Sequence, residues 1–348
     1  MERVIRVLVV DDSAYVRKVV RQMLSRDPFI EVVGTAHDGE EALELVERLQ
    51  PDVVTLDLIM PRMDGVTFLR EQMKRRPIPV VVVSIASEGG EMALAALDAG
   101  AVDFVQKPTA LATEKIFEIS DDLIAKVKAA AGARLNHLQA VQELESVQRP
   151  ISDQTQRSGR VEAVVIGIST GGPQALRYLI PRLPGDLPVP VGVVLHMPEG
   201  YTGPYAERLN QISALEVVEA QEGTSFKPGR VIIARAGRHL TLRRQGNGQV
   251  VAHLDVRPFD TLHRPSADVL FRSAAEVYGD KVLGIVMTGM GSDGKMGAAW
   301  IKSQGGLIFT EAEETCVVYG MPRSVDEAGL SDRSVPLHEM AEAILSVL

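Results

Sequence analysis

The chain has 348 residues and is 45% hydrophobic and 24% charged, which fits two globular domains and excludes both a small disulfide-held fold and wholesale disorder. Its formal net charge of -9, without any run of basic residues, argues against a nucleic-acid partner. Cys316 is the single cysteine, so no intrachain disulfide can form and an oxidising compartment gains no support.

The chain begins with an aliphatic run that two acidic residues follow directly. Val4–Val10 has the composition of a strand covered on both faces, and it is neither a signal peptide nor long enough to span a membrane. We therefore expect a cytoplasmic protein without membrane insertion. Four more apolar runs alternate with helical patterns: Glu31–Ala36, Val53–Asp57, Val80–Ser84 and Val102–Val105. This alternation predicts a five-stranded, parallel, doubly wound sheet of the flavodoxin-like kind.

The composition changes after the last helical pattern of this half. Residues 128–157 contain few large apolar side chains in their second half and accumulate Gln, Ser and Arg, as linkers do. We therefore expect a first domain at residues 1–127, a linker at 128–157 and a second domain at 158–348.

The second half returns to alternating apolar runs and helical patterns. Its strongest candidate strands are Val161–Ile168, Val191–Leu195 and Val282–Met287. They predict a second α/β domain, doubly wound around a mostly parallel sheet. Three shorter runs lie between them: Val231–Ala234, Leu240–Arg243 and Gln249–Leu254. Because Gly246-Asn247-Gly248 separates the last two, we expect an antiparallel hairpin in this region.

Acidic residues end two strands of the first predicted sheet. Asp11 and Asp12 follow the first strand and Asp57 ends the third, and the strand order 2-1-3-4-5 brings these two ends together at the switch point. Three converging carboxylates need a cation, and oxygen ligands of this kind suit magnesium. Ser84 and Lys107 follow the fourth and fifth strands, where they can receive the oxygens of a phosphoryl group on Asp57. The alternative is that these acids only cap helices or end strands.

These residues, in this order, resemble the response-regulator receiver domain over residues 3–127. The resemblance implies that a partner histidine kinase phosphorylates Asp57. It also implies that Asp12, Asp57 and the Ile59 carbonyl bind magnesium, while Asp11 acts mainly through a bridging water. Three residues are implied in the response to the phosphoryl group: Ser84, Phe104 and Lys107.

A second candidate site begins at a glycine-rich turn. Gly167–Gly171 fits the pattern G-x-S-x-G, which places Ser169 on a sharp turn between a strand and a helix, where N–H groups can face an oxyanion. A nucleophilic serine needs a base. His196 follows one further predicted strand and Asp293 lies just beyond another, so three triad residue types fall on one edge of the sheet.

Other interpretations of this turn stay open. Ser169 is also suited to cap a helix or to belong to a phosphate-binding loop. However, neither G-x-G-x-x-G nor G-x-x-x-x-G-K-[ST] occurs in the chain. The order Ser, His, Asp differs from the three familiar orders of serine hydrolases, which argues against an ordinary α/β-hydrolase.

Five separated segments resemble the catalytic domain of the chemotaxis receptor methylesterase (CheB) family: Gly167–Pro173, Leu195–Pro198, Arg264–Ser266, Met287–Gly294 and Val318–Pro322. Together with the receiver, the resemblance covers nearly the whole chain. It implies that Ser169 is the nucleophile, that His196 is the general base and acid, and that Asp293 orients the histidine. It also implies that Thr170 and the Met290 backbone help to stabilise the oxyanion.

The resemblance implies a phosphorylation-activated hydrolase. Its substrates are methyl-accepting chemotaxis receptors, whose glutamate methyl esters release methanol and whose glutamines are deamidated. Catalysis needs no cofactor, magnesium serves only the receiver, and a monomer is expected. Two alternatives remain: an interaction protein that binds an anion at Gly167–Gly172, and a hydrolase for another acyl substrate.

Overall fold

The computed structural model describes residues 3–84, 90–107, 113–133, 160–258 and 260–348. The chain divides into two compact units, Met1–Gln139 and Ala140–Leu348, and each is described by itself. None of the helices in the described parts of the chain is long and apolar enough to cross a membrane.

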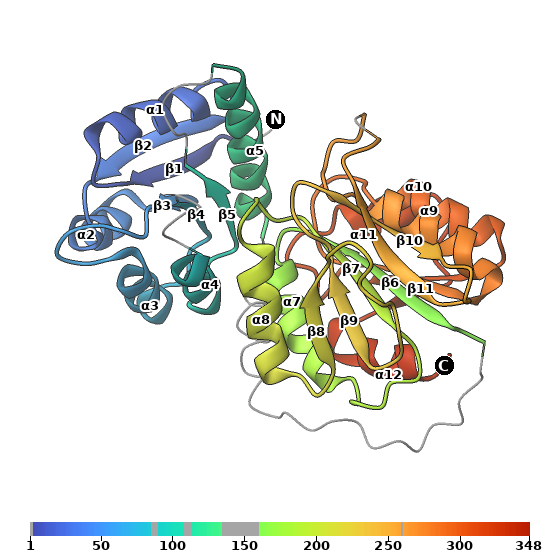
Figure 1. Ribbon diagram of the computed structural model, residues 1–348. Helices are drawn as coiled ribbons and strands as arrows, with labels where there is room; N and C mark the ends of the chain where they lie inside the picture. Colours follow the sequence, from blue (N-terminus) through green and yellow to red (C-terminus); the bar gives the residue numbers. More distant parts are fainter. Residues whose placement is uncertain (1–2, 85–89, 108–112, 134–159, 259) are drawn as a thin grey trace. The chain divides into compact units, whose positions relative to one another are not determined.

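The described part of the first unit is built on a parallel sheet with the strand order β2-β1-β3-β4-β5 (Figure 1). The strands are β1 (Ile5–Val10), β2 (Ile30–Ala36), β3 (Val53–Leu56), β4 (Val80–Ser84) and β5 (Asp103–Gln106). The helices are α1 (Ala14–Leu24), α2 (Gly39–Leu49), α3 (Gly65–Arg75), α4 (Gly90–Asp98) and α5 (Thr113–Ala131). Helices α1 and α5 pack together, as do α2 and α3, and α3 and α4. The predicted five-stranded doubly wound sheet is confirmed.

The end of the first unit bears on the expected linker. Helix α5 continues to Ala131, and residues 134–159 lie outside the described residues. The expected boundaries at residues 127 and 158 therefore stay a prediction.

The second unit contains a larger parallel sheet in its described residues, with the order β14-β13-β12-β6-β7-β9-β8. Its strands are β6 (Ala163–Ile168), β7 (Val191–Leu195), β8 (Glu216–Glu219), β9 (Arg230–Ile233), β12 (Val282–Val286), β13 (Leu307–Glu311) and β14 (Arg333–Val335). The helices are α7 (Gly172–Leu179), η1 (Ile180–Arg182), α8 (Thr202–Ile212), α9 (Ala267–Tyr278), η2 (Gly279–Lys281), α10 (Lys295–Ser303), α11 (Met321–Asp326) and α12 (Leu337–Leu345). Strand β6 lies between β7 and β12, so the strand order reverses beside it.

The antiparallel hairpin expected in this unit is confirmed. Strands β10 (His239–Arg244) and β11 (Val250–Asp255) form the expected antiparallel hairpin, which packs on α9. The third short run, Val231–Ala234, lies largely in β9, which pairs in parallel with β7 and β8. The residues from Val231 to Ile233 are fully buried there, and a short apolar run without alternation fits a strand covered on both faces.

A close contact fixes helix α9 on the central strand. A Cβ atom at Gly167 of β6 would lie 2.6 Å from the Cβ of Ala267, so only glycine permits this approach. Phe271, one turn further along α9, is also fully buried. The N-terminus of α9 is thereby held next to the carboxyl end of β6, where the candidate catalytic residues lie.

Candidate active site and phosphorylation site

Ser169 lies in a tight turn between β6 and α7. Its N–H donates to the Thr288 carbonyl (2.9 Å), and its own carbonyl accepts from the Gly172 N–H (2.7 Å). Gly171 has a φ of +79°, and a Cβ there would lie 2.6 Å from the Val317 side chain. A residue with a side chain would therefore strain this turn and clash, which explains the glycine after the serine.

His196 lies at the neighbouring strand end and pairs with Asp293. Its N–H donates to the Ile168 carbonyl (3.1 Å), which places it beside the residue that precedes Ser169. Its ring Nε2 lies 2.8 Å from Asp293 Oδ2, and both side chains are almost entirely buried. The buried Nδ1 has no hydrogen-bond partner in the described part of the chain. A neutral ring that donates from Nε2 leaves the Nδ1 lone pair available as a base.

The Asp293 carboxylate is held by the beginning of α9. Besides His196, it accepts hydrogen bonds from four donors: Ser266 Oγ (2.8 Å), Ala267 N (2.7 Å), Asp268 N (3.0 Å) and Gly294 N (3.1 Å). Burial raises the pKa of Asp293, but three effects outweigh burial and hold that pKa well below its usual value: the hydrogen bond from His196, the positive charge of His196 whenever its ring is protonated, and the N–H donors. The carboxylate is therefore ionised and fixed in direction.

Two further residues contact this pair. The Asp268 carboxyl, which accepts the Gly297 N–H (2.7 Å), has its pKa raised to about 6 by burial and by the charge of Asp293. The His263 ring stacks on His196, with ring centroids 4.1 Å apart. A serine ahead of a helical pattern indicates a helix start, and this was the available signal for Ser266 and Asp268.

The two residues predicted to stabilise an oxyanion also lie around the Ser169 turn. Thr170 is buried directly after the serine. Met290 follows Gly289, where a Cβ would lie 2.7 Å from the Ser169 Cβ, so this loop passes directly against the serine. The Met290 N–H makes no hydrogen bond to any described residue. An unused N–H beside a serine is what an oxyanion hole requires.

The hydrogen bond expected between a serine nucleophile and its histidine base is not formed in this structure. Among the described residues, no hydrogen bond joins the Ser169 hydroxyl to His196. Such bonds are often long in structures without substrate and shorten when substrate binds.

The first unit brings its predicted acids and lysine together. Lys107 Nζ lies 2.9 Å from Asp11 Oδ2 and 2.6 Å from Asp57 Oδ2, and all three side chains are buried. Asp12 is exposed, and ligand atoms of the three acids lie within 4.8 Å of one another. Burial, with the charge of Asp11, raises the pKa of Asp57 even though Lys107 lowers it. Three carboxylates offset by one ammonium fit a hard divalent cation.

The remaining residues predicted for this site lie in or next to the same strands. Ser84 ends β4, is buried, and accepts the Lys107 N–H at its carbonyl (2.7 Å). Phe104 is buried in β5. The Ile59 N–H lies 3.3 Å from Asp57 Oδ1, so the residue predicted to offer its carbonyl to the metal follows Asp57 closely.

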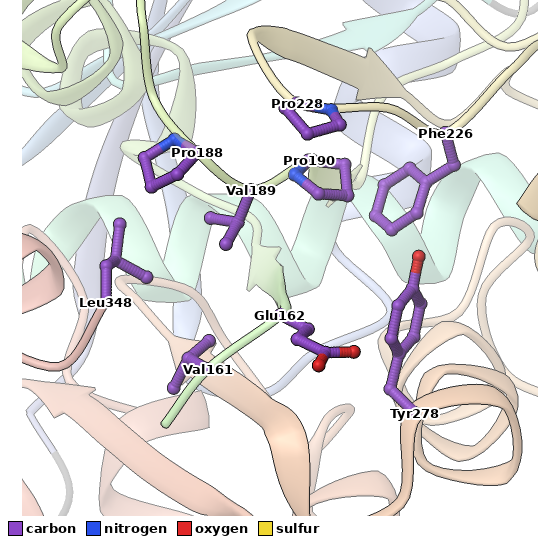
Figure 2. Close-up of a pocket in the computed structure, with 9 residues that line it drawn as sticks. All are labelled: Val161, Glu162, Pro188, Val189, Pro190, Phe226, Pro228, Tyr278 and Leu348. Atoms are coloured by element: carbon purple, nitrogen blue, oxygen red, sulfur yellow. The ribbon is translucent and has the colours of Figure 1, made fainter. Parts of the chain in front are cut away.

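A pocket of about 430 Å³ lies at the amino ends of strands β6 and β7 of the second sheet (Figure 2). Its walls come from the segments before β6 and β7, with Glu162 and Pro190, and from Tyr278 at the end of α9. Glu162, the carboxylate in the lining, forms an ion pair with Lys281. Because Ser169, His196 and Asp293 follow the opposite strand ends, this pocket is separate from the candidate active site.

The fold and the two sites define a class of two-unit α/β protein. One unit has acidic residues and a lysine at the carboxyl ends of its strands, and the other has a serine, a histidine and an aspartate at the corresponding strand ends, as serine hydrolases do. Residues 164–344 match the family model described as CheB methylesterase, and residues 7–118 match the response regulator receiver domain. The chain therefore belongs to the CheB methylesterase family.

Relatives match along nearly the whole chain. The protein-glutamate methylesterase/protein-glutamine glutaminase 5 of Myxococcus xanthus is 52% identical over 338 residues, which are 97% of this chain and 96% of that protein. A relative with the same activity in its name, from Symbiobacterium thermophilum, is 46% identical over 99% of this chain and 97% of its own length. The crystal structure of the Thermotoga maritima CheB methylesterase catalytic domain is 44% identical, with a TM-score of 0.53, and covers 54% of this chain and 99% of that one.

Proposed function

We propose that this chain is a phosphorylation-activated serine hydrolase that removes methyl groups from glutamate methyl esters of chemotaxis receptors and deamidates receptor glutamines. The observation that carries the hydrolase mechanism is the His196–Asp293 hydrogen bond at strand ends on either side of Ser169. The names of relatives that match from end to end support the substrate class.

The proposed reaction starts at the Ser169 hydroxyl. His196 accepts the hydroxyl proton at Nδ1, because Asp293 already occupies Nε2, and Ser169 Oγ attacks the ester carbonyl. The Met290 N–H and Thr170 stabilise the oxyanion of the tetrahedral intermediate. The imidazolium then returns the proton to the leaving methoxide, and methanol departs.

The second half of the reaction restores the enzyme. Water, deprotonated by His196, attacks the glutamyl ester of Ser169. The imidazolium then returns the proton to the departing Ser169 Oγ, and the released glutamate ionises, so a negative charge returns to the receptor. A glutamine side chain gives the same acyl-enzyme when ammonia leaves instead of methanol.

In the receiver, we assign phosphorylation to Asp57, with a chemotaxis histidine kinase as phosphodonor. Asp11, Asp12 and Asp57, with the Ile59 carbonyl, would hold Mg²⁺, which when bound neutralises charge on the phosphoryl oxygens. Lys107 lies 2.6 Å from Asp57 and is placed to bind a phosphoryl oxygen. Two further residues are proposed to rearrange in response: Ser84 and Phe104.

The proposal also covers the state of the protein in the cell. We propose a cytoplasmic monomer that acts on the cytoplasmic parts of its receptors, without a nucleic-acid partner.

Two measurements test the hydrolase. Ser169→Ala is expected to abolish methanol release from methylated receptors, because loss of a triad nucleophile lowers turnover by ~10⁶. A fluorophosphonate probe should label the wild-type chain and leave Ser169→Ala unlabelled. Retained methanol release would contradict the assignment of Ser169. Labelling without methanol release from receptors would keep the hydrolase but reject the substrate.

A further inference from the structure

A buried carboxyl group lies behind the Ser169 turn. Glu311 ends β13 and is 0% exposed. Its Oε2 accepts the Thr288 N–H (2.9 Å), and its Oε1 accepts the Thr315 hydroxyl (3.1 Å). A carboxyl group in the interior is costly unless its hydrogen bonds are made, and an apolar side chain would fill the same space more cheaply. The position of Glu311 therefore calls for an explanation beyond packing.

Thr288 connects this carboxyl to the nucleophile. The Thr288 carbonyl accepts the Ser169 N–H (2.9 Å), and its hydroxyl donates to the Thr170 carbonyl (3.0 Å). The same hydroxyl accepts the Val318 N–H (3.0 Å). Thr288 thus holds the main chain of both Ser169 and Thr170. Glu311 in turn holds Thr288 at its N–H.

We propose that Glu311 is a positioning residue, which fixes the Thr288 peptide and through it the Ser169–Thr170 main chain. This inference rests on the function proposed above. Glu311 is separated from Ser169 by Thr288, so it acts through another residue and does not touch the reacting atoms. A serine displaced by a fraction of an ångström loses its alignment with both the base and the oxyanion donors.

The surroundings of Glu311 determine how readily its carboxyl group ionises. Burial raises its pKa to about 7, although the hydrogen bonds from Thr288 and Thr315 lower it. Its described hydrogen-bond partners, Thr288 and Thr315, are uncharged, and the buried Cys316 thiol donates to its backbone carbonyl (3.6 Å) and not to its carboxyl group. No lysine, arginine or histidine among the described residues pairs with it.

Both protonation states can hold Thr288. In the ionised form, both carboxylate oxygens accept. In the neutral form, a proton on Oε1 donates to the Thr315 hydroxyl, whose own hydrogen can turn to the Ala312 carbonyl 3.3 Å away. Oε2 accepts the Thr288 N–H in either case. Because a glutamine amide reproduces the neutral form, the required feature is the acceptor for Thr288 and not the negative charge.

The test compares Glu311→Gln with Glu311→Met in the full chain, using fluorophosphonate labelling of Ser169 and methanol release. Glu311→Gln is expected to stay within about threefold of the wild-type rates. Glu311→Met, which keeps the volume but removes the acceptor, is expected to lower the labelling rate and kcat at least tenfold with KM within twofold. The exposed Glu314→Gln is the matched control and is expected to behave as the wild type.

Labelling is measured well below the melting temperature of each variant and normalised to folded protein. A Glu311→Met chain that is less stable but labels at the wild-type rate would show a purely structural role and overturn the proposal. Equal losses in Glu311→Gln and Glu311→Met would also overturn it, because the acceptor would then not be the required feature. If the wild-type chain itself is not labelled at Ser169, the proposed function fails, which is a different outcome.

If Glu311→Met does not fold, Thr288→Ala replaces it. This variant keeps the peptide that contacts Glu311 but removes the hydroxyl that binds Thr170 and Val318. A labelling rate at least fivefold lower supports positioning through Thr288, and an unchanged rate overturns it.

Discussion

At the scale of single residues, the catalytic assignment depends on what His196 can do with each ring nitrogen. Asp293 lies at Nε2 and is itself fixed by the N–H groups of Ala267 and Asp268. The histidine ring therefore has one orientation, in which Nδ1 is left for the serine. Stacking by His263 restrains the ring plane further. A buried ring held from two sides has little freedom to lose when the reaction begins.

This geometry predicts an order of effects in the pair. His196→Gln should lower kcat nearly as far as loss of the nucleophile, since no base remains. Asp293→Asn should leave more activity, because base and nucleophile persist and only the orientation of the ring suffers. Methanol release from methylated receptor measures both, with the exposed Asp280→Asn as control. Wild-type rates in His196→Gln or Asp293→Asn would reject the triad.

Glu311 predicts a pH dependence of stability. Its pKa is about 7 in the folded chain, against an ordinary value of 4.5, so between these pH values the folded state binds more protons than the unfolded state. Raising the pH from 4.5 to 7 therefore removes about 3 kcal/mol of stability. Glu311→Gln cannot ionise and should be more stable than the wild type at pH 8, relative to pH 5, by roughly this amount.

Denaturant unfolding of residues 158–348 at both pH values measures this difference. Glu314→Gln serves as control, because that side chain is exposed. If the stability difference between Glu311→Gln and the wild type is the same at pH 5 and pH 8, Glu311 does not titrate in this range.

At the scale of elements, the start of helix α9 links the fold to the site. Ser266 precedes α9, but its hydroxyl donates to Asp293 and makes no capping hydrogen bond to the helix. The Ser266 hydroxyl therefore holds the Asp293 carboxylate and does not cap the helix. The contact between Gly167 and Ala267 keeps this helix end in place.

We predict that Ser266→Ala lowers kcat about tenfold with little change in KM or melting temperature. A hydrogen bond to a charged group contributes roughly 1.5–3 kcal/mol, of which part is recovered because three N–H donors still hold Asp293. The measurement is methanol release at several receptor concentrations. A melting temperature lowered by several degrees with unchanged kcat would instead identify Ser266 as a helix cap.

Local sequence patterns predicted much of the two sheets. Apolar runs marked the strands, and the ends of β1 and β3 located the acidic site because carboxyl ends of parallel strands meet at one edge. The parallel placement of β9 was missed, because an apolar run shows burial but not its neighbours. The roles of Thr288 and Glu311 depend on contacts between distant segments, which leave no periodic signal. The helix-start pattern at Ser266 does not show that its hydroxyl binds Asp293. The family and its activity are confirmed, whereas the individual catalytic roles stay predictions.

At the scale of the whole molecule, the chain combines two sheets with different proposed sites, one for phosphorylation and one for ester hydrolysis. Asp57 is buried against Lys107 and becomes doubly charged when phosphorylated, so the local balance of charge changes there. A receiver can regulate a hydrolase in the same chain if its phosphorylation state alters substrate access to Ser169 or the geometry around it. We propose that the unphosphorylated receiver inhibits the hydrolase and that phosphorylation relieves the inhibition.

This model predicts the behaviour of two variants. Residues 158–348 alone should be faster in methanol release than the unphosphorylated full chain. Asp57→Asn in the full chain should stay at the low rate when a small phosphodonor and magnesium are added. Shifting a closed-to-open equilibrium from 1:99 to 99:1 requires ~5.5 kcal/mol, so a weaker effect of the phosphoryl group gives the partial activation that we expect. If the isolated domain is no faster and Asp57→Asn still responds to the phosphodonor, the inhibitory model is wrong even when Ser169 is the nucleophile.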